Sequence, residues 1–212
     1  AVDALAGPGD NTAQVATRKL KRQIRDFEPS VTMIGQVKAG KTTLVNALTG
    51  WPGLLPADIN PWTSVVTALH LDPAARGDAG KAKFRFFDED EWDRLLTRGG
   101  RMGELASRAG AHKELEKVRF QLEEMREKSR QRLGKKFELL MGQEHEYGYV
   151  DEELVQRYVC LGDDLDTDNS ADQKHGQFAD ITKSADLYLG QPALPHRLCI
   201  RDTPGVNDTF MI

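Results

Sequence analysis

The fold is decided by SVTMI at residues 30–34, followed directly by GQVKAGKT at residues 35–42. The first segment is rich in β-branched side chains and predicts a short buried strand. The second matches the pattern G-x-x-x-x-G-K-[ST]. A helix is expected over residues 41–48, with Gly50 and Pro52 ending it. A glycine-bearing loop between a strand and a helix is the context that a phosphate-binding loop requires.

The composition of this loop suits a polyphosphate. Its glycines let the backbone curl so that successive N–H groups point inward, and the following helix adds free N-terminal amides and the positive end of its dipole. We expect Lys41 to reach the β- and γ-phosphates and the Thr42 hydroxyl to hold Mg²⁺. The residues expected to bind nucleotide are Gly35, Gln36, Val37, Lys38, Ala39, Gly40, Lys41, Thr42 and Thr43.

A second motif, DTPG at residues 202–205, follows the apolar segment LCI at residues 198–200. Asp202 is expected to hold Mg²⁺ through water, and the Gly205 amide is expected to face the γ-phosphate. Glycine suits that position because the backbone must approach closely without a side chain. The two motifs, each after a strand and in this order, favour a nucleotide switch more strongly than either does alone.

A nucleotide switch also needs a hydroxyl from a mobile loop. Thr63 is the best candidate, because it follows a loop punctuated by Pro56 and Pro61 and opens a predicted strand at residues 63–71. From there its hydroxyl is expected to reach Mg²⁺. The alternative is that Thr63, with the neighbouring hydroxyl residues of TSVVT, is an ordinary strand residue.

The chain divides into four predicted segments. Residues 1–28 hold a loose tail and a helix with a basic face, and residues 29–96 hold the phosphate loop and the candidate switch threonine. Residues 97–177 are dense in Glu, Lys and Arg and predict a helical insertion followed by an acidic loop. Residues 178–212 return to strands and the second motif. This pattern predicts an α/β P-loop NTPase domain, incomplete at its end, with a helical insertion between switch I, the segment of Thr63, and switch II, the segment of DTPG. The resemblance described below implies that it is of the GTPase type.

The composition narrows the class of protein. Hydrophobic residues make up 39% and charged residues 29% of the 212 positions, which is typical of a soluble globular chain. A net charge of −4 gives no reason to expect nucleic acid as a partner. The two cysteines, Cys160 and Cys199, are expected to be reduced thiols in a cytosolic protein. The five histidines lack metal-binding spacing and are expected to be surface or structural residues.

Four stretches resemble the dynamin superfamily, in particular the bacterial dynamin-like proteins related to mitofusins. They are GQVKAGKTTLVNALTG and LLPADINPWTSVVTAL in the first half, then ITKSADLYL and LCIRDTPGVND near the end. The resemblance covers residues 29–96 and 178–208 and leaves out the helical insertion.

This resemblance implies a GTPase that binds GTP and GDP, uses Mg²⁺, and dimerises in a nucleotide-dependent way through its GTPase face. It also implies peripheral membrane association of the full protein and a role in membrane fusion or fission, with no nucleic acid as partner. We therefore expect a cytoplasmic protein, with the inner face of the cell membrane as an alternative location. The helix before Pro29 would belong to a neck bundle. By resemblance, phosphate, Mg²⁺ and switch roles fall to Lys41, Thr42, Thr63, Asp202 and Gly205.

The chain departs at the catalytic positions from the proteins that it resembles. Conventional dynamins place Gln-Ser where this chain has Val37-Lys38, and Val206 stands where small GTPases carry a water-positioning Gln. Lys38 is therefore a candidate for the cation that assists hydrolysis, alongside Lys41. The alternative is that Lys38 faces solvent or pairs with an acidic residue across a dimer. The expected catalytic set is Lys38, Lys41, Thr63 and Gly205.

Two other functions stay open at this stage. One is a GTP-dependent scaffold with little hydrolysis, and the other is a ribosome-associated GTPase, which the acidic net charge disfavours. The preference for guanine rests on the resemblance, because the base-reading motif would follow residue 212. A chain that starts without Met and stops just after DTPG is expected to be a fragment, weak or inactive by itself.

Overall fold

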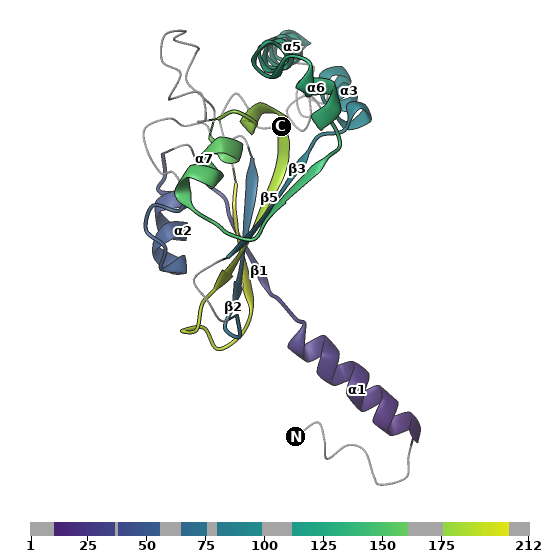
Figure 1. Cartoon of the computed structure of the whole chain (residues 1–212), viewed down its shortest axis with the longest axis vertical. Helices are drawn as coiled ribbons and strands as arrows, with labels where there is room; N and C mark the ends of the chain where they lie inside the picture. Colours follow the sequence, from purple (N-terminus) through teal and green to yellow (C-terminus); the bar gives the residue numbers. More distant parts are fainter. Residues whose placement is uncertain are drawn as a thin grey trace.

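A computed structural model describes residues 11–36, 38–55, 65–75, 80–98, 112–160 and 176–203. Its core is a six-stranded sheet with helices packed on it, and the first helix of the chain projects away from the sheet (Figure 1). In chain order the elements are α1 (Asn11–Arg25), β1 (Ser30–Met33), α2 (Lys41–Thr49), β2 (Val66–Asp72), β3 (Lys81–Phe86), α3 (Glu89–Arg98), α5 (His112–Leu133), α6 (Lys136–Leu140), β4 (Glu144–Tyr147), α7 (Glu152–Val159), η3 (Ala179–Ile181), β5 (Thr182–Gly190) and β6 (Leu198–Asp202).

The strand order is β1-β6-β2-β5-β3-β4, and the sheet is mixed. β1 runs parallel to β6, and β2 runs parallel to β5. β2 is antiparallel to β6, while β3 is antiparallel to both β5 and β4. The strand that leads into the phosphate loop therefore lies beside the strand that ends at Asp202, although most of the chain separates them in sequence.

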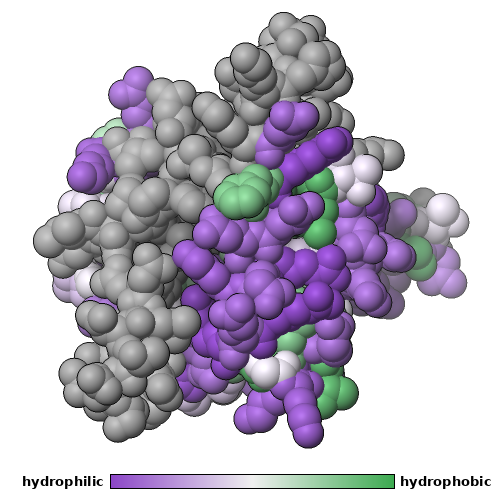
Figure 2. All heavy atoms as spheres, turned by 90° about the horizontal axis from the view of Figure 1, so that it is seen from above, coloured by the Kyte–Doolittle hydropathy of each residue, from purple (hydrophilic) through white to green (hydrophobic). Residues whose placement is uncertain are grey.

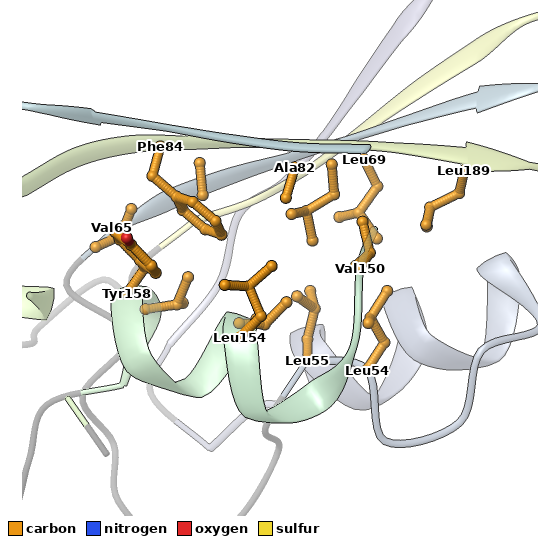
Figure 3. Close-up of a cluster of buried hydrophobic side chains, with 14 of the residues drawn as sticks. Leu54, Leu55, Val65, Leu69, Ala82, Phe84, Val150, Leu154, Tyr158 and Leu189 are labelled. Atoms are coloured by element: carbon orange, nitrogen blue, oxygen red, sulfur yellow. The ribbon is translucent and has the colours of Figure 1, made fainter. Parts of the chain in front are cut away.

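One face of the sheet carries the main hydrophobic core (Figure 3). Alternate strand residues point from this face toward α7 and the segment that follows α2, as strand geometry requires. The Phe84 and Tyr158 rings stack there with centroids 3.9 Å apart and planes 11° apart. Leu54 and Leu55 fill the space beside α7 and are almost fully buried. Burying this set removes a large apolar area from water, the dominant favourable term in folding.

The opposite face of the sheet is polar in its β3 and β4 region. Lys83 on β3 contacts Glu144 at 2.6 Å and Glu146 at 3.3 Å on β4. Glu91 of α3 pairs with Lys183 of β5 at the same face. Antiparallel strands with one face on the core and the other toward solvent alternate between more buried and more exposed side chains, as β3 and β4 do.

A second hydrophobic cluster joins α3 to α5 through Trp92, Leu122 and Met125. Further along α5, Arg132 forms a 3.1 Å ion pair with the buried Asp180 of η3. Burial raises the pKa of Asp180, and the Arg132 charge opposes this shift. Seen from above, the described surface is mostly hydrophilic (Figure 2). No helix in the described ranges combines the length and the apolar character needed to cross a bilayer.

The expected helical insertion over residues 97–177 differs from the structure in two ways. Glu144–Tyr147 is a strand on the edge of the sheet, paired with β3, where helix was expected. Its charged and partly buried residues alternate, a strand period that the surrounding Glu- and Lys-rich sequence concealed. α7 belongs to the main core through Leu154 and Val155. Asp151 caps the N-terminus of α7, since its carboxylate accepts from the Leu154 N–H at 2.7 Å.

The segment that leads out of α2 depends on Asn46. Its side-chain amide donates to the Leu55 carbonyl at 2.6 Å and accepts from the Leu55 N–H at 3.0 Å. We expect Asn46→Ala to lower the free energy of unfolding by about 2–4 kcal/mol, because both backbone groups of Leu55 lose their partner in a buried place. Urea denaturation followed by tryptophan fluorescence measures this. Gln131→Ala removes an exposed amide on α5 and should change stability by less than about 0.5 kcal/mol.

Candidate nucleotide-binding site

The phosphate loop begins where β1 ends and closes at the N-terminus of α2. The Ala39 N–H donates to the Gln36 carbonyl at 3.2 Å, and the Leu44 N–H donates to the Gly40 carbonyl at 2.9 Å. Gly40 lies in the left-handed region with φ of 79°, which glycine tolerates without strain. Lys38 has φ of 61°, a conformation that disfavours a side chain. The curvature of the loop therefore includes a left-handed backbone conformation at Lys38, which is strained for a residue with a side chain.

Lys41 is held inside this loop. Its ammonium donates to the Gly35 carbonyl at 3.1 Å and to the Gln36 carbonyl at 2.9 Å. An ammonium has three N–H donors, so these two bonds leave one for a ligand. The positive charge is thereby fixed at the centre of the loop, close to the N-terminal amides of α2, where an anion is stabilised.

Thr42 and Asp202 are brought together across 160 positions of sequence. The Thr42 hydroxyl donates to Asp202 Oδ2 at 2.7 Å. This contact follows from the register of β1 and β6, which places Met33 opposite Asp202 at the ends of parallel strands. The Thr203 hydroxyl also donates to the Met33 carbonyl at 2.5 Å and fastens the end of β6 to β1.

Opposing effects act on the pKa of the Asp202 carboxyl group. Its residue is 3% exposed, and burial raises its pKa, while the Thr42 hydrogen bond and the Lys41 charge lower it. Asp202 Oδ1 is buried with no hydrogen-bond partner among the described residues. A buried, unpartnered carboxylate oxygen beside a hydroxyl is an oxygen donor set of the kind that Mg²⁺ binds. The residues present therefore fit the ion that the phosphate loop implies.

The structure places most of the predicted site residues in one region. Gly35, Gln36, Lys41 and Thr42 line the loop, and Asp202 faces it from β6. Val37, Thr63 and Gly205 lie outside the described residues, so their predicted roles stay predictions. The hydrogen bond from Thr203 to Met33 was not predicted. The sequence alone does not show whether a threonine in this motif contacts a ligand or a neighbouring strand.

Comparison with known proteins places this geometry in a family. Residues 31–210 match the family model described as "Dynamin family". The chain belongs to the dynamin family. Within this family, a stretch of 41 residues is 49% identical to a bacterial dynamin-like protein of Nostoc punctiforme, covering 19% of this chain and 6% of that protein. The predicted P-loop GTPase fold is confirmed, and so is the resemblance to bacterial dynamin-like proteins. The branch related to mitofusins stays a prediction.

The fold of this dynamin-family domain also matches solved structures. Two chains from an oligomerised bacterial dynamin pair, described as a mechanism for long-range sensing and tethering of membranes, align with TM-scores of 0.51 and 0.50. Sequence identity is 18% and 20%, and the alignments cover 93% and 95% of this chain. They cover only 22% and 26% of the solved chains, so this chain spans about a quarter of their length.

The bond between Thr42 and Asp202 can be tested without nucleotide. We expect Thr42→Ala to lower the free energy of unfolding by about 1–3 kcal/mol, since a buried carboxylate loses its hydroxyl donor. Thr42→Ser keeps the donor and should restore most of this loss. Chemical denaturation of the nucleotide-free protein checks both variants. Equal destabilisation by Ala and Ser would mean that the threonine methyl group, and not the hydroxyl, carries the effect.

Proposed function

We propose that this dynamin-family domain binds GTP together with Mg²⁺ and hydrolyses it. The proposal rests on one observation, the 2.7 Å contact between the Thr42 hydroxyl and the buried Asp202 carboxylate beside the loop that holds Lys41. These groups come from the two motifs that a nucleotide switch needs. Their side chains meet at the carboxyl ends of parallel strands, the edge where open α/β sheets bind ligands.

The chain's own groups account for binding. Backbone N–H groups of the loop and of the α2 N-terminus surround the β-phosphate, and the Lys41 ammonium bridges toward the γ-phosphate. Thr42 and Asp202 would hold Mg²⁺, the first through its hydroxyl and the second through water. The ion would supply positive charge that offsets the charge of the phosphates. Thr63 and Gly205 are proposed to sense the γ-phosphate through a hydroxyl and a backbone amide.

Lys38 is proposed to assist the hydrolytic step. It is exposed, and within the part of the chain that the structure describes no hydrogen bond or ion pair engages its ammonium. A lysine in the left-handed region costs about 1–2 kcal/mol relative to glycine, and such strain is often retained at functional sites. Closure of the site by a second GTPase face would bring this cation toward the phosphates and exclude water.

We further propose that the complete protein couples hydrolysis to membrane fusion or fission. The support is indirect: the solved bacterial dynamins that share this fold are described as an oligomerised pair that senses and tethers membranes. A nucleotide-dependent homodimer through the GTPase face, peripheral membrane association and a cytoplasmic location follow as parts of the same proposal.

A scaffold with little hydrolysis is the second candidate. Val206 follows Gly205, so the sequence offers no glutamine at that position to orient the attacking water. In that case GTP binding would order the domain for assembly, and release of nucleotide would reverse it.

Single-turnover hydrolysis separates the two functions. We expect the full-length protein with Mg²⁺ to convert bound GTP to GDP, and to do so faster with liposomes. Lys41→Ala should weaken nucleotide binding by about 100-fold or more, because charge-assisted bonds to two phosphates are lost. Lys136→Ala, an exposed lysine of α6, is the matched control. Tight GTP binding without turnover under all conditions would support the scaffold instead.

The role of Lys38 predicts a specific kinetic pattern. We expect Lys38→Asn to lower kcat by roughly 10³-fold while GTP affinity stays within a few-fold, because the contact forms mainly in the transition state. Asparagine tolerates the left-handed backbone, so this variant removes the charge and spares the loop. Lys38→Arg should retain part of the rate. Unchanged kcat in Lys38→Asn at protein concentrations that favour dimerisation would remove Lys38 from the catalytic set.

A further inference from the structure

A second polar cluster lies at the end of the sheet away from the phosphate loop. The register of the strands places Cys199 opposite His70 on one side and opposite Ser30 on the other. Because neighbours in register point to the same face, the Cys199 and His70 side chains share the face opposite the main core. Glu28 precedes Ser30 by two positions and brings its carboxylate to that face from the connection between α1 and β1.

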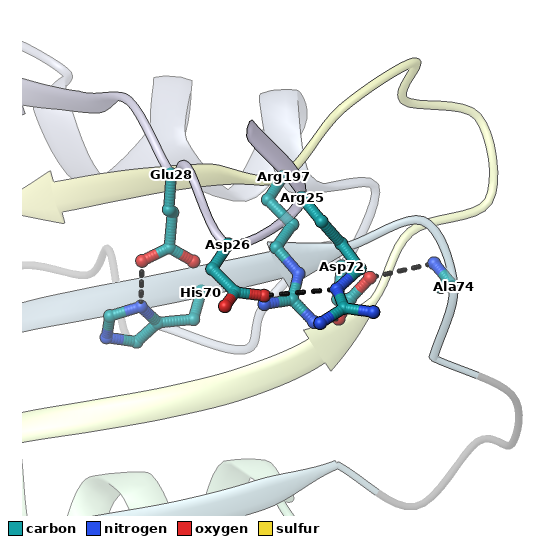
Figure 4. A network of polar contacts seen from close by, with 7 residues as sticks. All are labelled: Arg25, Asp26, Glu28, His70, Asp72, Ala74 and Arg197. Carbon is teal, nitrogen blue, oxygen red and sulfur yellow. Dashed lines mark hydrogen bonds and ion pairs between the residues drawn. The ribbon is translucent and has the colours of Figure 1, made fainter. Parts of the chain in front are cut away.

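The three side chains converge on a small volume. His70 Nδ1 lies 2.8 Å from Glu28 Oε2 (Figure 4). One ligand atom from each of Glu28, His70 and Cys199 lies within 4.8 Å of the other two. Cys199 is 2% exposed, while the side chains of His70 and Glu28 are 19% and 28% exposed. The thiol is thus enclosed at the bottom of the cluster, and the imidazole and carboxylate close it toward solvent.

The His70 ring is held in position from two further directions. Its Nε2 lies 3.1 Å from Asp186 Oδ1. The Tyr188 ring stacks on the imidazole with centroids 4.6 Å apart and planes 13° apart. A carboxylate on one ring nitrogen, with the other nitrogen aimed at further ligand atoms, is the arrangement that orients metal-binding histidines in proteins.

Two basic side chains beside this cluster are paired with carboxylates outside it. Arg197 pairs with Asp72 at 2.6 Å, and Arg25 pairs with Asp26 at 3.3 Å (Figure 4). Within the described ranges, the ion pairs of Glu28 and Asp186 both go to His70. Two carboxylates therefore share a single imidazole, which leaves an excess of negative charge for a cation to balance.

We propose that Glu28, His70 and Cys199 form a binding site for a divalent cation of the Zn²⁺ type. Oxygen, imidazole nitrogen and thiolate sulfur are the ligands that zinc prefers, and a site with three protein ligands keeps a fourth position for water. Ligand atoms around tetrahedral zinc lie about 3.5 Å apart, given typical bond lengths. To reach that spacing, ligand atoms up to 4.8 Å apart would close by about 1.3 Å, and the 2.8 Å pair of His70 Nδ1 and Glu28 Oε2 would open by about 0.7 Å.

Proton balance follows from the ligand types. Binding converts the Cys199 thiol to a thiolate and requires His70 Nδ1 to be unprotonated, so protons leave to solvent as the metal enters. Asp186 keeps the proton on Nε2 and holds the ring in the tautomer that presents Nδ1. No oxidant or further reactant is involved.

The position of the site gives the metal a mechanical role. Glu28 lies three residues after the end of α1, while His70 and Cys199 belong to adjacent strands of the sheet. A metal bound here would fasten the connection that follows α1 to β2 and β6. The site is separate from the nucleotide, because Cys199 precedes Asp202 by three residues, roughly 10 Å along the strand.

Cobalt substitution tests this site directly in the full-length protein. Co²⁺ added to the metal-free protein should give a near-ultraviolet charge-transfer band that reports a thiolate ligand, and Zn²⁺ should displace it at one ion per chain. Cys199→Ser should abolish the band. Cys160→Ser, which removes the other cysteine at the end of α7, is the matched control and should keep it. Survival of the band in Cys199→Ser would overturn the proposal, as would its absence from the wild type.

A second set of variants keeps the test valid where serine at the buried position 199 prevents folding. Glu28→Gln and Asp186→Asn lie at partly exposed positions, and their fold can be checked by circular dichroism. We expect each to weaken Zn²⁺ binding about 10–100-fold, with Asp186 acting as a positioning residue. Zn²⁺ should also slow hydrogen exchange at residues 26–30 in the wild type and not in Glu28→Gln. Unchanged Zn²⁺ affinity in both variants would leave only a protonated imidazole between two carboxylates and would overturn the proposal.

Discussion

The parallel pairing of β1 with β6 is the constraint on which the rest of the site depends. It sets Met33 beside Asp202, so the segments that follow both strands leave the sheet at the same edge. The carboxyl ends of parallel strands lie at the same edge of the sheet, so the groups proposed to bind phosphate and metal can come together from distant parts of the sequence. The hydrogen bonds that Thr42 and Thr203 form here both join residues that are far apart in the sequence.

The same pairing creates two polar ends on one pair of strands. At one end, Asp202 meets the phosphate loop, and three residues earlier Cys199 meets His70 and Glu28. The apolar residue between them, Ile200, faces the main core. Side chains of β6 thus alternate between the core and the opposite face. This short, rigid strand links the nucleotide edge of the domain to the connection with α1.

Short sequence patterns predicted most of the helices and strands, but they did not predict the polar contacts between side chains of neighbouring strands. The phosphate loop, α2 and the Asp151 cap each follow from a few adjacent residues, because loop curvature and helix caps are set locally. β4 was concealed because its charged residues belong to a solvent-facing edge strand, where alternation is short and polarity is high. The cluster around His70 has no sequence signature, since its members are neighbours only through strand register.

The evidence is different for three residues that lie outside the described ranges, namely Val37, Thr63 and Gly205. Their proposed roles rest on motif order and on resemblance, while those of Lys41 and Thr42 are supported by contacts in the fold as well. The left-handed backbone of Lys38 belongs to neither group, because the motif allows any residue there and only the folded loop reveals the strain.

The distance between the two halves of the site has a consequence during synthesis on the ribosome. Thr42 emerges 160 residues before Asp202. At a translation rate of ~5–20 residues per second, the phosphate loop waits roughly 10–30 s for its acidic partner. Over that interval β1 lacks β6, and the nascent chain carries a cationic loop and an unpaired strand edge. The order of the motifs along the gene therefore makes assembly of the nucleotide site a late step in folding, after the intervening helices have had time to form.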